Sequence, residues 1–149
     1  MIALLQRVSS ARVVVAGETR GAIRKGVLAF IGVQRGDDET RADRLLTRIL
    51  GYRMFEDRAG RMNLGLQDAG GGLLLVPQFT LAADTRKGMR PSFTPAAEPA
   101  LGRRLYGYLL QQAQRRHGEV ASGVFGAHME VHLVNDGPVT FWLEAPPAR

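Results

Sequence analysis

Two short polar motifs contain the residues of this sequence whose types and spacing are best suited to chemistry. The first is Pro77-Gln78-Phe79-Thr80-Leu81, which follows an apolar run, so that an amide and a hydroxyl side chain flank an aromatic ring. Segments that follow strands often present backbone amides and hydroxyls to a ligand. The alternative is structural, because Gln and Thr are frequent at such boundaries, with Phe79 packed in the core.

The second motif is Asn135-Asp136-Gly137-Pro138-Val139-Thr140. Asn, Asp, Gly and Pro all favour turns, so its structural interpretation is a turn that joins two strands. The proline also makes the Gly137–Pro138 bond a candidate for the cis form, which about 5–6% of X–Pro bonds in folded proteins adopt.

Other familiar catalytic and metal-binding patterns are missing from the sequence. It contains no Gly-x-Ser-x-Gly, P-loop or His-Glu-x-x-His motif, no cysteine, and no evident pair of carboxylates. His117 lies at a predicted helix end. His128 and His132 are four residues apart on a predicted strand, about 13 Å, which is too far to chelate one metal ion. We therefore expect no metal and no cofactor, and catalysis that relies on backbone groups and on the substrate.

The composition limits the class of protein. The chain has 149 residues, 45% of them hydrophobic and 23% charged, which suits one folded domain. Its longest apolar runs, Val27 to Val33 and Leu73 to Val76, are too short to span a membrane. No signal peptide is visible, and we expect a cytoplasmic protein. The net charge of +6 is compatible with RNA as a partner, although arginines on solvated helix faces explain it equally well.

Hydrophobic periodicity predicts the elements that position the two motifs. A helix follows the N-capping residues Asp37 and Asp38 and buries one apolar stripe. A second helix begins near Pro99 and ends near Gly118. The stripe of the first helix consists of Ala42, Leu45, Leu46, Ile49 and Leu50. The predicted strands are Ile2 to Arg7, Ala11 to Ala16, Thr19 to Ile23, Val27 to Val33, Tyr52 to Phe55, Leu73 to Val76, Met129 to Leu133 and Val139 to Leu143.

These elements predict an α+β fold with mostly antiparallel, barrel-like β-sheets and two main helices. Residues 82–95 lack periodicity and are expected to form a long loop. We expect one domain over residues 1–145, followed by a flexible tail, 146–149.

In this order, the two motifs resemble the signature pair of the D-aminoacyl-tRNA deacylases. The resemblance runs from Met1 to about Leu143. Further matching stretches are Ile2 to Val8, Leu50-Gly51-Tyr52-Arg53, Met62-Asn63-Leu64, Ala82-Ala83-Asp84-Thr85 and Gly88-Met89-Arg90-Pro91-Ser92-Phe93.

The resemblance implies a homodimer with active sites at the subunit interface, which binds the RNA 3′ end of D-aminoacyl-tRNA and needs neither DNA nor a membrane. In this family a cis Gly-Pro peptide enters the partner's site. Here Gly137 and Pro138 would face the α-carbon, so that an L side chain collides with the backbone and a D side chain does not. Selection by rejection admits glycine, and we expect activity on glycyl-tRNA(Ala).

The same resemblance assigns roles around the ester bond that water would hydrolyse. Backbone amides near Phe79 and Thr80 would stabilise the oxyanion, Gln78 would hold the pocket, and the substrate's 2′-hydroxyl would help to activate water. The alternative makes Thr80 a covalent nucleophile, which needs a base that the sequence does not reveal. The family usually has serine where this chain has Pro77, so any role of that hydroxyl is absent here.

Four further residues are candidates for supporting roles. Phe125 and Met129 would pack against the terminal adenine, or alternatively belong to the core. Arg7 would brace the Gly-Pro segment, or alternatively is a solvated cation at a strand end. Asn135 would support the same segment.

Two other functions remain open from the sequence. One is a non-catalytic RNA-binding module, although no RNA-recognition or KH signature is evident. The other is a hydrolase of a different small ester, with Thr80 as its nucleophile.

Overall fold

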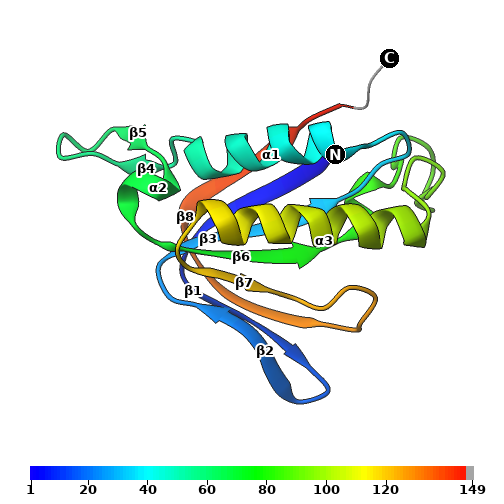
Figure 1. Ribbon diagram of the computed structural model, residues 1–149, viewed down its shortest axis with the longest axis horizontal. Coiled ribbons are helices and arrows are strands. Elements are labelled where there is room, and N and C mark those ends of the chain that lie inside the picture. The colour runs from blue at the N-terminus through cyan, green and yellow to red at the C-terminus, as the bar shows by residue number, and fades with distance from the viewer. Residues whose placement is uncertain (147–149) are drawn as a thin grey trace.

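A computed structural model describes residues 1–146 of the chain (Figure 1). The predicted tail, 146–149, therefore lies outside the described residues except for Pro146. In chain order the elements are β1 (Ile2–Val15), β2 (Glu18–Ile23), β3 (Gly26–Gly32), α1 (Glu39–Gly51), β4 (Phe55–Glu56), β5 (Met62–Leu64), α2 (Leu66–Ala69), β6 (Gly72–Pro77), the 3-10 turn η1 (Phe79–Ala82), α3 (Pro99–Arg116), β7 (Val120–Ser122) and β8 (Glu130–Glu144).

The main sheet has the strand order β2-β1-β3-β6-β7, with β8 paired to β1. Its antiparallel part consists of the pairs that β1 makes with β2, β3 and β8, whereas β3, β6 and β7 run parallel. The sheet nearly closes into a barrel, because β2 returns to β7: a Cβ added to Gly21 would lie 2.5 Å from the Ser122 carbonyl oxygen. The expected antiparallel character is thus only partly correct, since the sheet is mixed.

The central strands are apolar on both faces because each face meets a different core. From β6, Leu73 and Leu75 point toward the helices, whereas Leu74 and Val76 point into the barrel. On β3, Val27 and Ile31 face the helices in the same way. This two-sided burial explains the uninterrupted apolar runs in the sequence.

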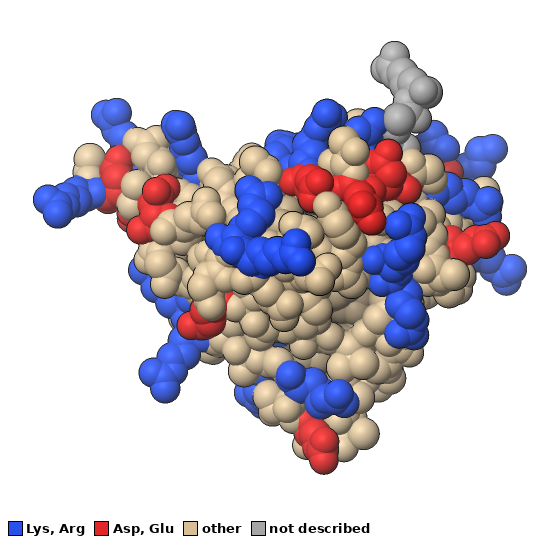
Figure 2. Space-filling model, in the orientation of Figure 1, with Lys and Arg blue, Asp and Glu red and all other residues tan. Residues whose placement is uncertain are grey.

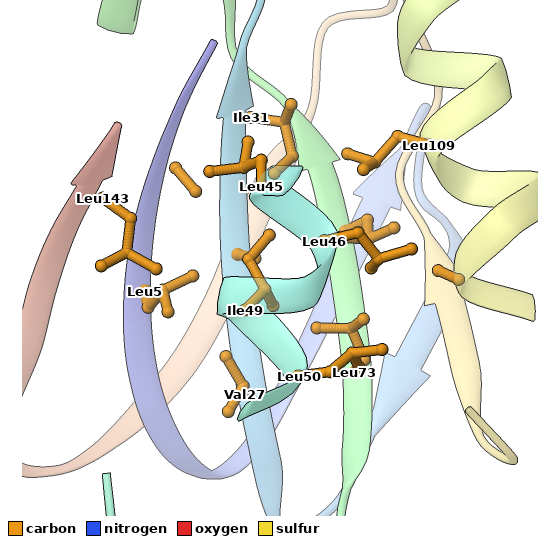
Figure 3. Close-up of a cluster of buried hydrophobic side chains, with 14 of the residues drawn as sticks. Leu5, Val27, Ile31, Leu45, Leu46, Ile49, Leu50, Leu73, Leu109 and Leu143 are labelled. Carbon is orange, nitrogen blue, oxygen red and sulfur yellow. The ribbon is translucent and has the colours of Figure 1, made fainter. Parts of the chain in front are cut away.

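The two long helices lie side by side on one face of the sheet (Figure 1). Asp38 caps α1, as predicted, by accepting a hydrogen bond from the Arg41 N–H at 2.9 Å. The predicted stripe of α1 is fully buried, and Figure 3 shows its leucines interleaved with side chains of β1, β3, β6 and α3. Helix α3 begins at Pro99, as predicted. The four-residue helix α2 was not predicted, and it makes the number of α-helices three among residues 1–146.

Several strand predictions need correction. The segments Ile2 to Arg7 and Ala11 to Val15 belong to one strand, β1, and the predicted last residue Ala16 lies in the turn that follows it. The segment Tyr52 to Phe55 is mostly irregular, since β4 starts only at Phe55. The strands β5 and β7 were missed, and each has only three residues.

The predicted turn at Asn135 to Pro138 is also wrong, because β8 continues through it. Gln6 pairs with Thr140 and Val8 with Asn135, so β8 has three more residues than β1 between these pairs. The excess forms a bulge in the ladder rather than a reversal of the chain. None of the helices within residues 1–146 is long and apolar enough to span a membrane.

Candidate functional site

The first motif leaves two neighbouring backbone N–H groups unpaired. The Gln78 N–H donates to the Ile31 carbonyl at 2.7 Å, which continues the β3–β6 pairing by one residue. The Leu81 N–H then closes the first 3-10 turn on the Gln78 carbonyl at 3.2 Å. Within residues 1–146, the intervening N–H groups of Phe79 and Thr80 have no backbone acceptor, as expected at the start of such a turn.

Within the first motif, Phe79 and Thr80 are exposed, whereas Leu81 packs against a small buried cluster that includes Ile2. Gln78 Nε2 donates to Thr80 Oγ1 at 2.5 Å. Phe79 is 60% exposed, and its ring packs against that of Phe93, with ring centroids 5.4 Å apart. The interpretation that places Phe79 in the core is therefore wrong.

A pocket with a volume of about 640 Å³ opens beside this turn, between the start of α3 and the loop that connects β7 to β8. Such a volume suits a nucleoside-sized ligand. Thr80 does not line it but contacts its wall through Gln78. The lining residues that the sequence singled out are Pro77, Gln78, Phe79, Phe125 and Met129. Phe125 and Met129 are half-buried and pack on the two cores as well, so both of their expected surroundings are present.

Other lining residues were not identified from the sequence, because residues from five segments converge here. They include Arg35, Phe93, Glu98, Tyr106 and His128. Tyr106 donates to the Leu75 carbonyl at 2.9 Å and shares a 2.6 Å hydrogen bond with Ser122, and burial raises the pKa of its phenol to about 12. His128 precedes β8, so the prediction that places His128 and His132 on the same strand is wrong.

The loop over residues 82–95 frames the pocket and is more ordered than its sequence indicates. Asp84 and Ser92 exchange backbone hydrogen bonds of 2.7 and 3.0 Å. Arg86 donates to both carboxylate oxygens of Asp84 and holds the pKa of that carboxyl at about 2. Phe93, which follows this bridge, is thereby held next to Phe79.

The second motif is anchored by Arg7, which is buried rather than solvated. Its guanidinium donates to the Asp136 carbonyl at 3.1 Å and to the Met54 carbonyl at 2.9 Å, and it pairs with the Asp136 carboxylate at 3.1 Å. Asn135 Nδ2 donates to the carbonyls of Arg7 and Val139 at 2.9 and 3.2 Å. The Gly137–Pro138 bond is cis and lies on the exposed side of the bulge.

A single chain does not bring the two motifs together. Pro77 is the partner of Ile31 on β3, and Ile31 is the partner of Ala3 on β1, whereas the bulge of β8 lies opposite Arg7 of β1. Ala3 and Arg7 are four residues apart, which separates the two motifs by about 13 Å along the strands. In addition, β8 is three strand spacings from β6, which separates them by about 14 Å across the sheet. A site that contains both motifs needs a second chain.

Comparison with known proteins gives consistent matches over the whole chain. The family model described as D-Tyr-tRNA(Tyr) deacylase matches residues 4–144. A D-aminoacyl-tRNA deacylase of Thioalkalivibrio sulfidiphilus is 74% identical over 149 residues, the full length of both chains. A solved structure titled c-Myc DNA Unwinding Element Binding Protein has a TM-score of 0.94 at 36% identity and covers 98% of this chain and 99% of its own.

A second solved structure, titled as a probable eukaryotic D-amino acid tRNA deacylase, has a TM-score of 0.81 at 16% identity, with coverage of 96% and 98%. At that identity the likeness concerns the fold alone.

Proposed function

Since the chain belongs to the D-aminoacyl-tRNA deacylase family, whose members are hydrolases, we propose that it removes D-amino acids from tRNA at sites that two copies of the chain build together. The deacylase domain spans residues 1–145, and the enzyme works in the cytoplasm, where charged tRNA is used. The separation of the two motifs within one chain is the observation that supports a site shared by two chains.

The proposed reaction is hydrolysis of the ester between the amino acid and the terminal ribose. A water oxygen attacks the carbonyl carbon, the bond from that carbon to the ribose oxygen breaks, and the water's proton leaves with the ribose hydroxyl. The unpaired N–H groups of Phe79 and Thr80 are suited to the oxyanion, because they are fixed by the turn before the substrate binds. The substrate's 2′-hydroxyl assists the water.

Thr80 supports this reaction without becoming acylated. Within residues 1–146, the hydrogen-bond partner of its hydroxyl is the amide nitrogen of Gln78, a donor that cannot accept a proton. A threonine nucleophile needs a base within reach, so this geometry favours direct attack by water.

We assign the discrimination between D- and L-amino acids to the carbonyls of Gly137 and Pro138 from the partner subunit. Arg7 and Asn135 hold that bulge through hydrogen bonds on both sides of it. A selector made of main chain rejects an L side chain by collision, whatever the side chain is, and it leaves glycine unopposed. We therefore include glycyl-tRNA(Ala) among the substrates.

The first experiment measures ester loss from D-tyrosyl-tRNA, L-tyrosyl-tRNA and glycyl-tRNA(Ala). Loss from the D and glycyl substrates with the L substrate intact is expected. Binding of the RNA without ester loss would favour a non-catalytic module, and equal loss from D and L substrates would contradict the selector.

The second experiment tests whether the sites are shared. Gln78→Ala damages the pocket, and Gly137→Ala damages the bulge, because an added Cβ would overlap Asn135 Oδ1. Each variant alone should lose most activity. In an equal mixture that has exchanged subunits, half of the dimers are mixed and each has one intact site, so about one quarter of wild-type activity returns. If each chain holds its own complete site, mixing restores nothing.

A further inference from the structure

We propose that Arg35 and Arg103 bind backbone phosphates of the tRNA 3′ strand where it leaves the pocket. This inference rests on the proposed function, since it concerns the same substrate at the same pocket. It assigns a docking role to two side chains that take no part in the chemistry.

The two arginines belong to different segments of the chain, and each lies beside the pocket or in its lining. Arg35 follows β3 and lines the pocket, and its backbone N–H donates to the Pro95 carbonyl at 3.0 Å. Arg103 lies in the second turn of α3, with its guanidinium carbon 4.8 Å from the ring centroid of Phe125, which also lines the pocket. A base that stacks on the free face of Phe125 would thus have Arg103 on the other face of the ring and Arg35 in the lining of the same pocket.

Both guanidinium groups are exposed, and within the described part of the chain neither forms an ion pair or a side-chain hydrogen bond. By contrast, Arg104 pairs with Glu39 at 3.5 Å, and Arg86 with Asp84 at 2.8 Å. Figure 2 shows basic side chains over both ends of α3, and at one end they extend toward the loop between β7 and β8. The positive charge at the mouth is therefore available to a ligand.

The chemistry of the substrate places its first anion at this position. The aminoacyl ester and the adenosine enter the pocket, and the adenosine carries no charge. The 5′ phosphate of that adenosine and the phosphates before it remain outside. Guanidinium groups bind phosphate oxygens through two parallel N–H donors. Glu98 also lines the pocket and repels phosphate, so the strand should leave on the side of the arginines.

The experiment compares two substrates that carry the same ester. D-tyrosyl-tRNA contains every phosphate, and D-tyrosyl-adenosine contains none. We would measure kcat/KM of the full-length dimer for both, across a range of salt concentrations, for Arg35→Gln, Arg103→Gln, the double variant and Arg103→Lys. The matched control is Arg115→Gln, an exposed arginine on the same helix and about 18 Å further along its axis.

The double variant should lower kcat/KM for D-tyrosyl-tRNA by about tenfold or more and reduce the slope of log kcat/KM against log salt by about 1.4, near 0.7 for each phosphate contact. D-tyrosyl-adenosine should be hydrolysed at a rate within about twofold of wild type, and Arg103→Lys should keep most of the salt dependence, because lysine retains the charge.

Two outcomes would overturn the inference. Equal losses on both substrates would mean that Arg103 acts by positioning Phe125. An unchanged kcat/KM for the tRNA would mean that the phosphates bind elsewhere. Failure of the proposed function is distinct from either, because the wild-type protein would then hydrolyse neither D substrate.

Discussion

The hydroxyl of Thr80 accepts a hydrogen bond, and this contact supports the proposal that water attacks the ester directly. Gln78 donates to it at 2.5 Å, and a hydroxyl oxygen that accepts such a bond is a weaker nucleophile than a free one. Of the first motif, the sequence correctly located the polar pair. It could not show that Phe79 is exposed, because an aromatic residue after a buried strand normally continues the core.

We expect Thr80→Ala to reduce the single-turnover rate of D-tyrosyl-tRNA hydrolysis by about 10- to 100-fold, the scale of a lost supporting contact. The pocket and the backbone amides should remain, so activity stays measurable above that of buffer. Rapid-quench measurement of ester loss checks this, with Thr80→Ser as the matched control that keeps the hydroxyl. Complete loss of activity, or an acyl-enzyme trapped on wild-type Thr80, would contradict it.

Arg7 illustrates a residue whose type suggested a role but whose burial could not be read from the sequence. We expect Arg7→Met, which keeps the length of the side chain without its donors, to lower the free energy of unfolding by about 1–3 kcal/mol, because the Met54 carbonyl loses its partner. Activity should fall further than stability explains, since the bulge also loses its contact at Asp136.

Urea denaturation and D-tyrosyl-tRNA hydrolysis measure these two effects on Arg7→Met. Arg12→Met is the control, because Arg12 is an exposed arginine of the same strand. Normal activity in a destabilised Arg7→Met would mean that the bulge needs no brace.

At the scale of elements, the long helices and the strands that are buried on both faces could be predicted from the sequence, whereas the pairing of the strands could not. The stripe of α1 and the N-cap at Asp38 are local patterns, and both are confirmed. The parallel pairing of β3 with β6 and β7 depends on contacts between distant segments, which no local pattern encodes. The turn predicted at Asn135 failed because Asn135 uses its amide to bond carbonyls of Arg7 and Val139, which keeps the chain extended.

Helix α3 is fastened to the sheet by the buried phenol of Tyr106, and this contact makes stability depend on pH. Its pKa of about 12 in the folded protein exceeds the ordinary value of 10.0, because burial disfavours the phenolate. The folded state therefore keeps a proton that the unfolded state releases. This contribution to stability is fully present below pH 10 and is lost as the pH rises toward 12.

We expect the ultraviolet absorbance of tyrosinate to show one group that titrates near pH 12, and Tyr106→Phe to remove it. The same variant should cost about 1–2 kcal/mol at neutral pH, because two hydrogen bonds are lost. It should also show a weaker decline of stability above pH 10 than the wild type. If the group that Tyr106→Phe removes titrates near 10 instead, the burial of Tyr106 is contradicted.

For the whole molecule, the sequence indicated a barrel-like α+β fold without showing how the barrel closes. Closure depends on the contact of β2 with β7, where the Gly21 α-carbon faces the Ser122 backbone. We expect Gly21→Ala to destabilise the fold by about 1–3 kcal/mol, because the strands must separate to admit a methyl group.

Thermal denaturation checks the closure, with Gly107→Ala as the control, since a Cβ at Gly107 meets no atom within 4 Å. The control should be neutral or slightly stabilising, because alanine favours the helix. If Gly21→Ala leaves the melting temperature unchanged, β2 and β7 are not in close contact.

The distance between the pocket and the bulge of one chain has a consequence for how the activity depends on the amount of protein. If each reaction centre draws its halves from two molecules, every isolated chain is inert, however well it is folded. Turnover per chain should then decline when the protein is diluted through the midpoint of dimer dissociation. Added variant chains in which only the pocket or only the bulge is intact should slow that decline.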